Sequence, residues 1–334
     1  MGTSEKIKER LTAIDSLRGI AILGVMVLHS DLEGLTDPAR RAILGVFDWS
    51  VLAFLLISGY LQNYEIPLTH VFRKRFVGLI IPFIVYNVVY NLFFLVFESP
   101  GIAPALGISV AKLEVGQPWW CWAFVSPAFQ LYFLPYLFAI TILSHGVLGR
   151  FSETTRKKSA GVILVLLPLL YLISPIPVIS HGASLAVVPF YMASFLLGGL
   201  LRLSRIWHRR WAVAFSGVIL ALLIFCSSLF PHPGLSLAIV GVLFIFVMNT
   251  WTGVNADGSG MALLGRCSGS IYLWHTPLLM PAVSAGLFAC GFISSLTWLL
   301  NIGISLAICI GVRLALEKIV FRGFGCSLPR VVTL

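Results

Sequence analysis

The sequence is poor in charge: only 11% of its 334 residues are Asp, Glu, Lys or Arg, whereas 58% are hydrophobic. A soluble domain carries about 25% charged residues, so this chain lacks the polar surface that a water-soluble fold needs. Its mean hydropathy is +0.96. The apolar runs are nearly continuous rather than alternating, which favours membrane-spanning helices over barrel strands. The scarcity of charge therefore predicts an all-α, polytopic membrane protein without a separate soluble domain.

Cysteine is also scarce, and the six cysteines show no metal-ligand spacing. They lie mostly in or beside apolar runs, where cysteine acts as a small hydrophobic residue. We therefore expect neither a metal nor a disulfide framework. The chain has no repeat period and no loop long enough for a further domain, so residues 1–334 are expected to form a single integral-membrane domain. The segment Thr12–Ser30 is not followed by a signal-cleavage pattern and is interpreted as the first span.

Apolar runs of about 20 residues predict ten transmembrane helices. They lie near residues 14–31, 45–62, 76–97, 125–148, 159–176, 184–203, 211–230, 235–252, 268–290 and 294–316. In the second of them, Ser58 and Gly59 are small residues of the kind that allows close helix packing in a bilayer.

The basic residues predict the orientation of these spans. Nineteen of the 23 Lys and Arg residues fall on the side that holds both termini, and only Arg40, Arg41 and Lys112 fall on the other. This bias predicts a multi-pass protein of the inner membrane with both termini in the cytoplasm. The net charge of +10 is spread over single residues and short clusters between spans, so a nucleic-acid partner is not expected.

The first predicted span contains three ionisable residues, Asp15, Arg18 and His29. Arg18 and His29 are eleven residues apart, so a helix places them on one face about 16 Å apart along its axis. Asp15 lies one turn before Arg18, close enough to pair with it. Taken singly, Arg18 could be a snorkelling anchor and His29 an interfacial histidine. Their shared face instead favours a polar path through the protein with His29 as general base, because imidazole titrates near neutral pH.

Five motifs, in order along nearly the whole chain, resemble acyltransferase family 3 of integral membrane proteins. In the first span, ten residues separate Arg18 from His29. The segment Phe54–Leu61 resembles the "FFxxSGYL" motif, with Leu55 in place of an aromatic residue. Residues Phe72–Phe76 resemble the basic cluster of the family, with Pro82 following it, and Leu131–Leu134 resembles the "WFL" element with Tyr132 in place of Trp. Ser268–Pro277 resembles the "SxxIYLxHxP" segment.

The resemblance implies a transferase that moves an acyl group, commonly acetyl, from cytoplasmic acyl-coenzyme A. The implied acceptors are hydroxyls of surface glycans, lipid-linked sugars or small molecules, so O-acetylation and polysaccharide modification are expected. Acyl-coenzyme A would be a co-substrate, and the partners would be a glycan or lipid-linked saccharide and the membrane lipids.

Two further groups of residues allow both a structural and a functional interpretation. Arg73 and Arg75 could be ordinary positive-inside charges. Alternatively they bind the phosphates of coenzyme A, because guanidinium groups bind phosphate bidentately. Ser268, Tyr272 and His275 share one face of the ninth predicted span. They could form interhelical hydrogen bonds. Alternatively they contact the donor, because this face begins at the predicted cytoplasmic end of the span.

The sequence therefore predicts His29 and Arg18 as the catalytic residues. Arg18, Arg73 and Arg75 are expected to hold the donor while His29 activates the acceptor hydroxyl. Direct transfer and an acylated His29 intermediate both remain open. A transporter or flippase for a lipid-linked or small polar substrate would also place Arg and His inside spans. A structural subunit is the third alternative.

Overall fold

The computed structural model describes residues 3–30, 35–97, 129–173, 188–204, 211–229, 233–251, 259–292 and 296–324. Within these ranges all regular structure is helical, which confirms the predicted all-α class. The residues near Trp119–Trp122, Asp31 and the long segment around Lys112 lie outside the described ranges.

The helices follow one another in this order: α1 (Thr3–Leu28), α2 (Asp37–Phe47), α3 (Ser50–Leu61), α4 (Leu68–Arg75), the π-helical turn η1 (Phe76–Ile80), α5 (Ile81–Phe97), the 3₁₀ turn η2 (Phe129–Tyr132), α8 (Phe133–Leu148), α9 (Glu153–Ile173), α10 (Val188–Ser204), α11 (Trp211–Leu229), α12 (Pro233–Trp251), α13 (Gly260–Trp274), the π-helical turn η6 (His275–Leu279), α14 (Met280–Ala289) and α15 (Thr297–Phe324). Each of the ten predicted spans overlaps at least one of these helices. Among the described residues, five continuous helical segments are long and apolar enough to cross a bilayer, and three shorter helices are apolar.

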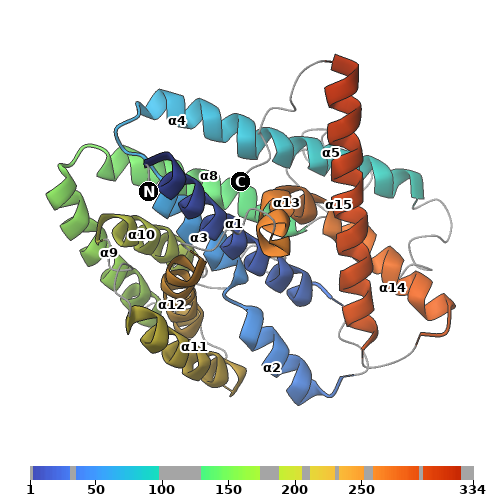
Figure 1. Cartoon of the computed structure of the whole chain (residues 1–334). Coiled ribbons are helices and arrows are strands. Elements are labelled where there is room, and N and C mark those ends of the chain that lie inside the picture. The colour runs from blue at the N-terminus through green and yellow to red at the C-terminus, as the bar shows by residue number, and fades with distance from the viewer. Residues whose placement is uncertain are drawn as a thin grey trace.

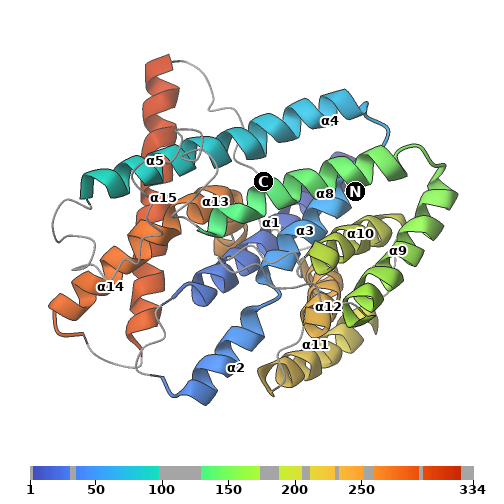
Figure 2. The same cartoon turned by 180° about the vertical axis from the view of Figure 1, so that it is seen from behind.

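Helices α1 and α3 lie at the centre of the fold (Figure 1). Helices α9 to α12 gather on one side, whereas α14 and α15 stand on the other. The continuous segment from α4 to α5 crosses one end of the bundle, and α8 covers the face seen from behind (Figure 2). Side chains with no exposed surface lie on α1 and α3 and on the helices that pack against them, for example Leu17, Leu55, Phe195 on α10 and Ile271 on α13.

The outer helices expose apolar side chains at helical spacing. On α11 these are Phe215, Val218, Leu222, Phe225 and Leu229, each more than half exposed. They follow one another at intervals of three and four residues and so form a continuous stripe on one helix face. A stripe of this kind would be costly in water and fits contact with lipid chains.

Close helix contacts rely on glycine, as expected where lipid removes the hydrophobic drive for helix association. On α3, a Cβ atom at Gly59 would meet the carbonyl oxygen of Phe195 on α10. On α10, a Cβ atom at Gly198 would meet the carbonyl oxygen of Leu56. The contact is therefore reciprocal, and the predicted role of Gly59 in close packing is confirmed.

Two predicted boundaries are wrong, both because charge or glycine interrupts an apolar run without ending a helix. The residues 63–75 were expected to form a loop, but the chain is helical from Leu68 onward, and Lys and Arg are good helix formers. The ninth span was placed from residue 268, but α13 begins at Gly260. Its N-cap is Ser259, whose hydroxyl accepts a hydrogen bond from the backbone N–H of Ala262 at 3.2 Å.

Candidate active site

The two histidines of the predicted motifs, His29 and His275, lie side by side in the structure. Their ring centroids are 5.3 Å apart, and the ring planes are inclined by 52°. His29 follows the last residue of α1, and His275 follows the last residue of α13. His275 has no exposed surface, and His29 is half-buried. We refer to these two residues as the histidine pair.

The face that bears Ser268, Tyr272 and His275 does not begin at the start of its helix, contrary to the predicted span boundary. Because α13 begins at Gly260, His275 lies about four turns along the helix. It therefore meets the far end of α1 instead of the end that carries Arg18.

Helices α1 and α13 run side by side in the same direction. A Cβ atom at Gly265 of α13 would meet the carbonyl oxygen of Asp15, and one at Gly19 of α1 would meet that of Met261. These contacts lie near the start of the shared interface, and the histidine pair lies about three turns further along. The glycines thus bring α13 against α1 closely enough for the two histidines to meet.

A break in the helix follows His275. Thr276 has an extended backbone, with φ −138° and ψ 156°, and the next residue, Pro277, has no N–H to donate. Two polar side chains make three hydrogen bonds to the backbone oxygens at this break. The Tyr90 hydroxyl donates to the carbonyl oxygens of Leu273 and Thr276, and the Gln130 side-chain amide also donates to Thr276. Irregular backbone at membrane depth needs such partners, because lipid offers none.

The hydrogen bonds of His275 fix its protonation pattern. Its Nδ1 lies 2.9 Å from the carbonyl oxygens of both Ile271 and Tyr272. A carbonyl only accepts, so Nδ1 carries the proton, and the neutral ring then has an unprotonated Nε2. Among the described residues this buried Nε2 has no hydrogen-bond partner. His275 therefore presents a free acceptor inside the protein, next to His29.

Tyr272 supports the same region, whereas Ser268 lies further away. The Tyr272 hydroxyl donates to the backbone oxygen of Gln130, and its ring centroid is 6.1 Å from that of His275. This is the interhelical hydrogen bond that the sequence allowed for Tyr272. Ser268 is buried about two turns before His275, on the same helix.

Arginines gather at the other end of α1. Arg18 is 9% exposed, and its Nη1 donates to a carboxylate oxygen of Asp15 at 3.4 Å, which confirms the predicted pair. Its buried Nε has no partner among the residues that the structure describes. Arg75 lies close enough for its charge to repel that of Arg18, and Arg266 lies close enough to attract Asp15. We call Arg18, Arg75 and Arg266 the arginine cluster.

The structure separates the two arginines of the predicted donor site. Arg75 is half-buried and lies within electrostatic reach of Arg18, whereas Arg73 is exposed. Residues two apart on a helix point in different directions, about 200° around the axis. Of Arg73 and Arg75, only Arg75 therefore belongs to the arginine cluster.

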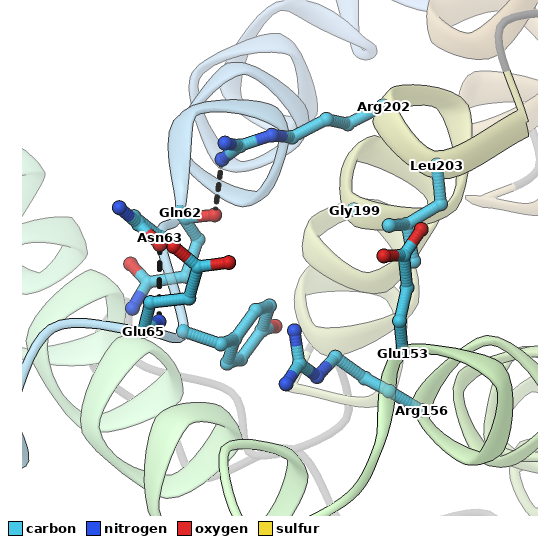
Figure 3. A pocket seen from close by; sticks show the side chains of 9 residues that line it. Gln62, Asn63, Glu65, Glu153, Arg156, Gly199, Arg202 and Leu203 are labelled. Atoms are coloured by element: carbon cyan, nitrogen blue, oxygen red, sulfur yellow. Dashed lines mark hydrogen bonds between the residues drawn. The ribbon is translucent and has the colours of Figure 1, made fainter.

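A separate polar cavity of about 220 Å³ lies where α3, α9 and α10 come together at one end of the bundle (Figure 3). The Nη1 of Arg202 donates to the backbone oxygen of Gln62 at 2.5 Å. The guanidinium of Arg156 lies 4.5 Å from the ring centroid of Tyr64, and its Nε donates to the backbone oxygen of Leu148 at 3.0 Å. Burial raises the pKa of Tyr64 to about 12, although the two arginines partly oppose this shift.

These interactions tie the loop after α3 to α8, α9 and α10. The cavity contains none of the residues that the sequence predicted for the site, and its arginines already bind backbone oxygens. We therefore interpret it as a structural clamp between helices.

Sequence reasoning missed three residues that contribute to the site region. Gln130 and Tyr90 support the helix break at Thr276, and Arg266 joins the arginine cluster. A signal was present for Gln130, because an amide inside a predicted span is uncommon and calls for a partner. No such signal marked Arg266, which was counted among the ordinary positive-inside charges.

A family model described as an acyltransferase domain matches residues 11–314, nearly the whole chain. The chain therefore belongs to acyltransferase family 3 and is a membrane acyltransferase. The family resemblance of the sequence motifs is confirmed. Searches of curated proteins and of solved structures find no match.

Proposed function

We propose that this membrane acyltransferase transfers an acyl group, acetyl in the first instance, from cytoplasmic acyl-coenzyme A to a glycan hydroxyl. The acceptor is an extracytoplasmic or lipid-linked saccharide. The observation that carries the proposal is the placement of two different polar groups along one helix. Arg18 belongs to the arginine cluster, and His29 of the histidine pair lies eleven residues further along the chain, about 16 Å away.

The arginine cluster supports binding of an anionic donor. Guanidinium groups bind phosphate through paired, charge-assisted hydrogen bonds. The charges of Arg18 and Arg75 repel each other, and Asp15 is the only carboxylate among the described residues that forms an ion pair with either. A bound phosphate would relieve this repulsion. Arg73 is exposed on the same helix and would attract the donor from outside the cluster.

The histidine pair supports the chemistry. In the proposed reaction His29 accepts the proton of the acceptor hydroxyl, whose oxygen attacks the thioester carbonyl. The carbon–sulfur bond breaks, and coenzyme A leaves as a thiolate that takes the proton back from His29. An acylated His29 that passes the group to the hydroxyl is the alternative route.

The orientation follows from the distribution of basic residues. With nineteen Lys and Arg residues on one side and three on the other, the protein lies in the inner membrane with both termini in the cytoplasm. The arginine cluster then faces the cytoplasm, where acyl-coenzyme A is made. The histidine pair lies towards the opposite face, where the glycan is available.

A transporter would also explain polar residues inside spans, but membership of an acyltransferase family favours group transfer. The two classes also differ in what they need. Transfer requires an acyl donor and a covalent product, whereas transport requires neither.

The test uses inside-out membrane vesicles from cells that express the protein, with acetyl-coenzyme A labelled in the acetyl group. We expect alkali-labile label in the glycan fraction. His29→Ala should lower the rate by about 10²- to 10⁴-fold while the Kd for acetyl-coenzyme A stays close to wild type. The matched control is His70→Ala, since His70 is exposed on α4 and should be dispensable.

An equally abundant and fully active His29→Ala protein would refute the site and leave transport or assembly as the better explanation. Label that remains on the acid-quenched protein, and disappears in His29→Ala, would establish the acylated-histidine route.

A further inference from the structure

We propose that His275 is the positioning residue for His29. The free Nε2 of His275 accepts a hydrogen bond from the N–H of His29, so that the opposite nitrogen of His29 faces the acceptor hydroxyl. This proposal rests on the function proposed above and adds a residue to the same site. It follows from the contacts of His275.

The anchoring of His275 comes first. Its Nδ1 hydrogen is held by two backbone oxygens, those of Ile271 and Tyr272, both at 2.9 Å. The ring therefore cannot exchange tautomers without losing both bonds. The Nε2 atom consequently stays an acceptor, buried and without a partner among the described residues.

The spacing of the histidine pair fits a direct contact between the rings. Two ring nitrogens joined by a hydrogen bond of about 3 Å place the ring centroids about 5 Å apart. The observed separation is 5.3 Å. Catalytic hydrogen bonds are often long or poorly aligned before substrate binds and shorten in the reacting complex.

The protonation of His29 then follows from that of His275. A neutral imidazole carries one N–H and one unprotonated nitrogen. Because Nε2 of His275 can only accept, His29 turns its N–H towards it. The other nitrogen of His29 is left unprotonated, which is the state that a general base requires.

The reaction balances with His275 in this role. The hydroxyl proton passes to the unprotonated nitrogen of His29, the hydroxyl oxygen bonds to the acyl carbon, and the carbon–sulfur bond breaks. His29 is then an imidazolium, and its second N–H remains hydrogen-bonded to Nε2 of His275, which stabilises the charge. The thiolate of coenzyme A finally takes a proton from His29 and becomes the thiol. The arrangement parallels that of serine hydrolases, where a third residue orients the catalytic histidine.

The helical backbone is interrupted immediately after His275, whose ring must be held rigidly for this role. Thr276 is extended, and its carbonyl oxygen accepts hydrogen bonds from Tyr90 and Gln130. These bonds fix the backbone immediately after His275. The ring is therefore held both through its own Nδ1 and through the chain that follows it.

Two substitutions separate the positioning role from a purely structural one. His275→Asn places an amide near the position of Nδ1, so it can keep the bonds to Ile271 and Tyr272 but offers no acceptor to His29. His275→Gln places its amide near the position of Nε2, so it keeps an acceptor for His29 but loses the anchor. We expect His275→Gln to retain more transfer activity than His275→Asn, by about tenfold or more.

A structural role predicts the opposite order, with His275→Asn active and His275→Gln impaired, and that order would overturn the proposal. Both proteins are compared with wild type in the labelled acetyl-coenzyme A vesicle assay, normalised to folded protein. The Kd for acetyl-coenzyme A should be unchanged in both.

A double variant provides the second measurement. Residues that act as one catalytic unit give non-additive losses. His29→Ala combined with His275→Asn should therefore be no slower than His29→Ala alone. Losses that multiply would show that His275 acts independently of His29 and would contradict the proposal.

The two proposals fail in different ways. If wild-type vesicles transfer no label, the proposed function fails. If wild type is active and needs His29, but His275→Asn is fully active, only the role of His275 fails.

Discussion

Gly265 on α13 lies so close to Asp15 on α1 that a Cβ atom at position 265 would overlap the carbonyl oxygen of Asp15. This contact fixes the register between α1 and α13. These two helices contribute Arg18 and Arg266 to the arginine cluster at one end and lead to the histidine pair at the other. A change at Gly265 should therefore affect both ends of the site at once.

Gly265→Ala should destabilise the protein by about 1–3 kcal/mol, as overpacking of a tight contact does. The backbone of Asp15 cannot move aside as a flexible side chain could. Thermal unfolding in detergent measures the effect. Gly161→Ala is the matched control, because no atom lies within 4 Å of a Cβ built at that helical position. A Gly265→Ala protein as stable as the control would contradict the close packing of α1 on α13.

Arg75→Ala should weaken the binding of acetyl-coenzyme A more than Arg73→Ala does. Arg75 is half-buried within electrostatic reach of Arg18, whereas Arg73 is exposed. Losing one charge-assisted contact costs about 1.5–3 kcal/mol, which raises Kd by about 10- to 150-fold. Titration of purified protein checks this, with Arg40→Ala as the control, because Arg40 is exposed on α2, away from the cluster. Equal and unchanged Kd values for both variants would make the arginines ordinary positive-inside charges.

Reporter fusions test the orientation. Fusions after Lys158 and after Arg210 should report the cytoplasm, whereas fusions near Lys112 and His232 should report the periplasm. The physical reason is the excess of basic residues on the cytoplasmic side of membrane proteins. The same side for Lys112 and Lys158 would rule out ten spans with this arrangement.

Alkaline pH should destabilise the clamp around Tyr64. The pKa of the Tyr64 phenol is raised to about 12 by burial, against about 10 in an unfolded chain. A raised pKa gives stability that is complete below pH 10 and is lost as the pH rises towards 12. Tyr64→Phe cannot ionise, so its midpoint of thermal unfolding should fall less between pH 9 and pH 12. A parallel loss in both proteins would show that Tyr64 is not responsible.

The helices could be predicted from sequence because each contains a long apolar run, and the pairing of Asp15 with Arg18 followed from local helix geometry. The meeting of His29 with His275 could not, because the two lie at the ends of separate helices. Their contact depends on how α13 packs on α1 through Gly265 and Gly19. The start of α13 was also missed, since Gly260 and Arg266 lower the hydropathy of a stretch that is nevertheless helical.

Gln130 illustrates the same limit. Its position inside a predicted span marked it as unusual, but its partners, Thr276 and Tyr272, come from a helix break that no periodicity indicates. Contacts between distant helices and irregular backbone were therefore the parts of the site that the residue pattern did not specify.

The distance between Arg18 and His29 acts as a molecular ruler under the proposed function. A rigid helix sets this distance at about 16 Å, so a donor engages both ends only if its anionic group and its acyl carbon are a similar distance apart. The long flexible arm of coenzyme A meets this condition. In acetyl phosphate the acetyl group is bonded directly to the phosphate, so that molecule can occupy the arginines or reach the histidines, but it cannot do both. Selection among acyl donors would then depend on length as well as on charge.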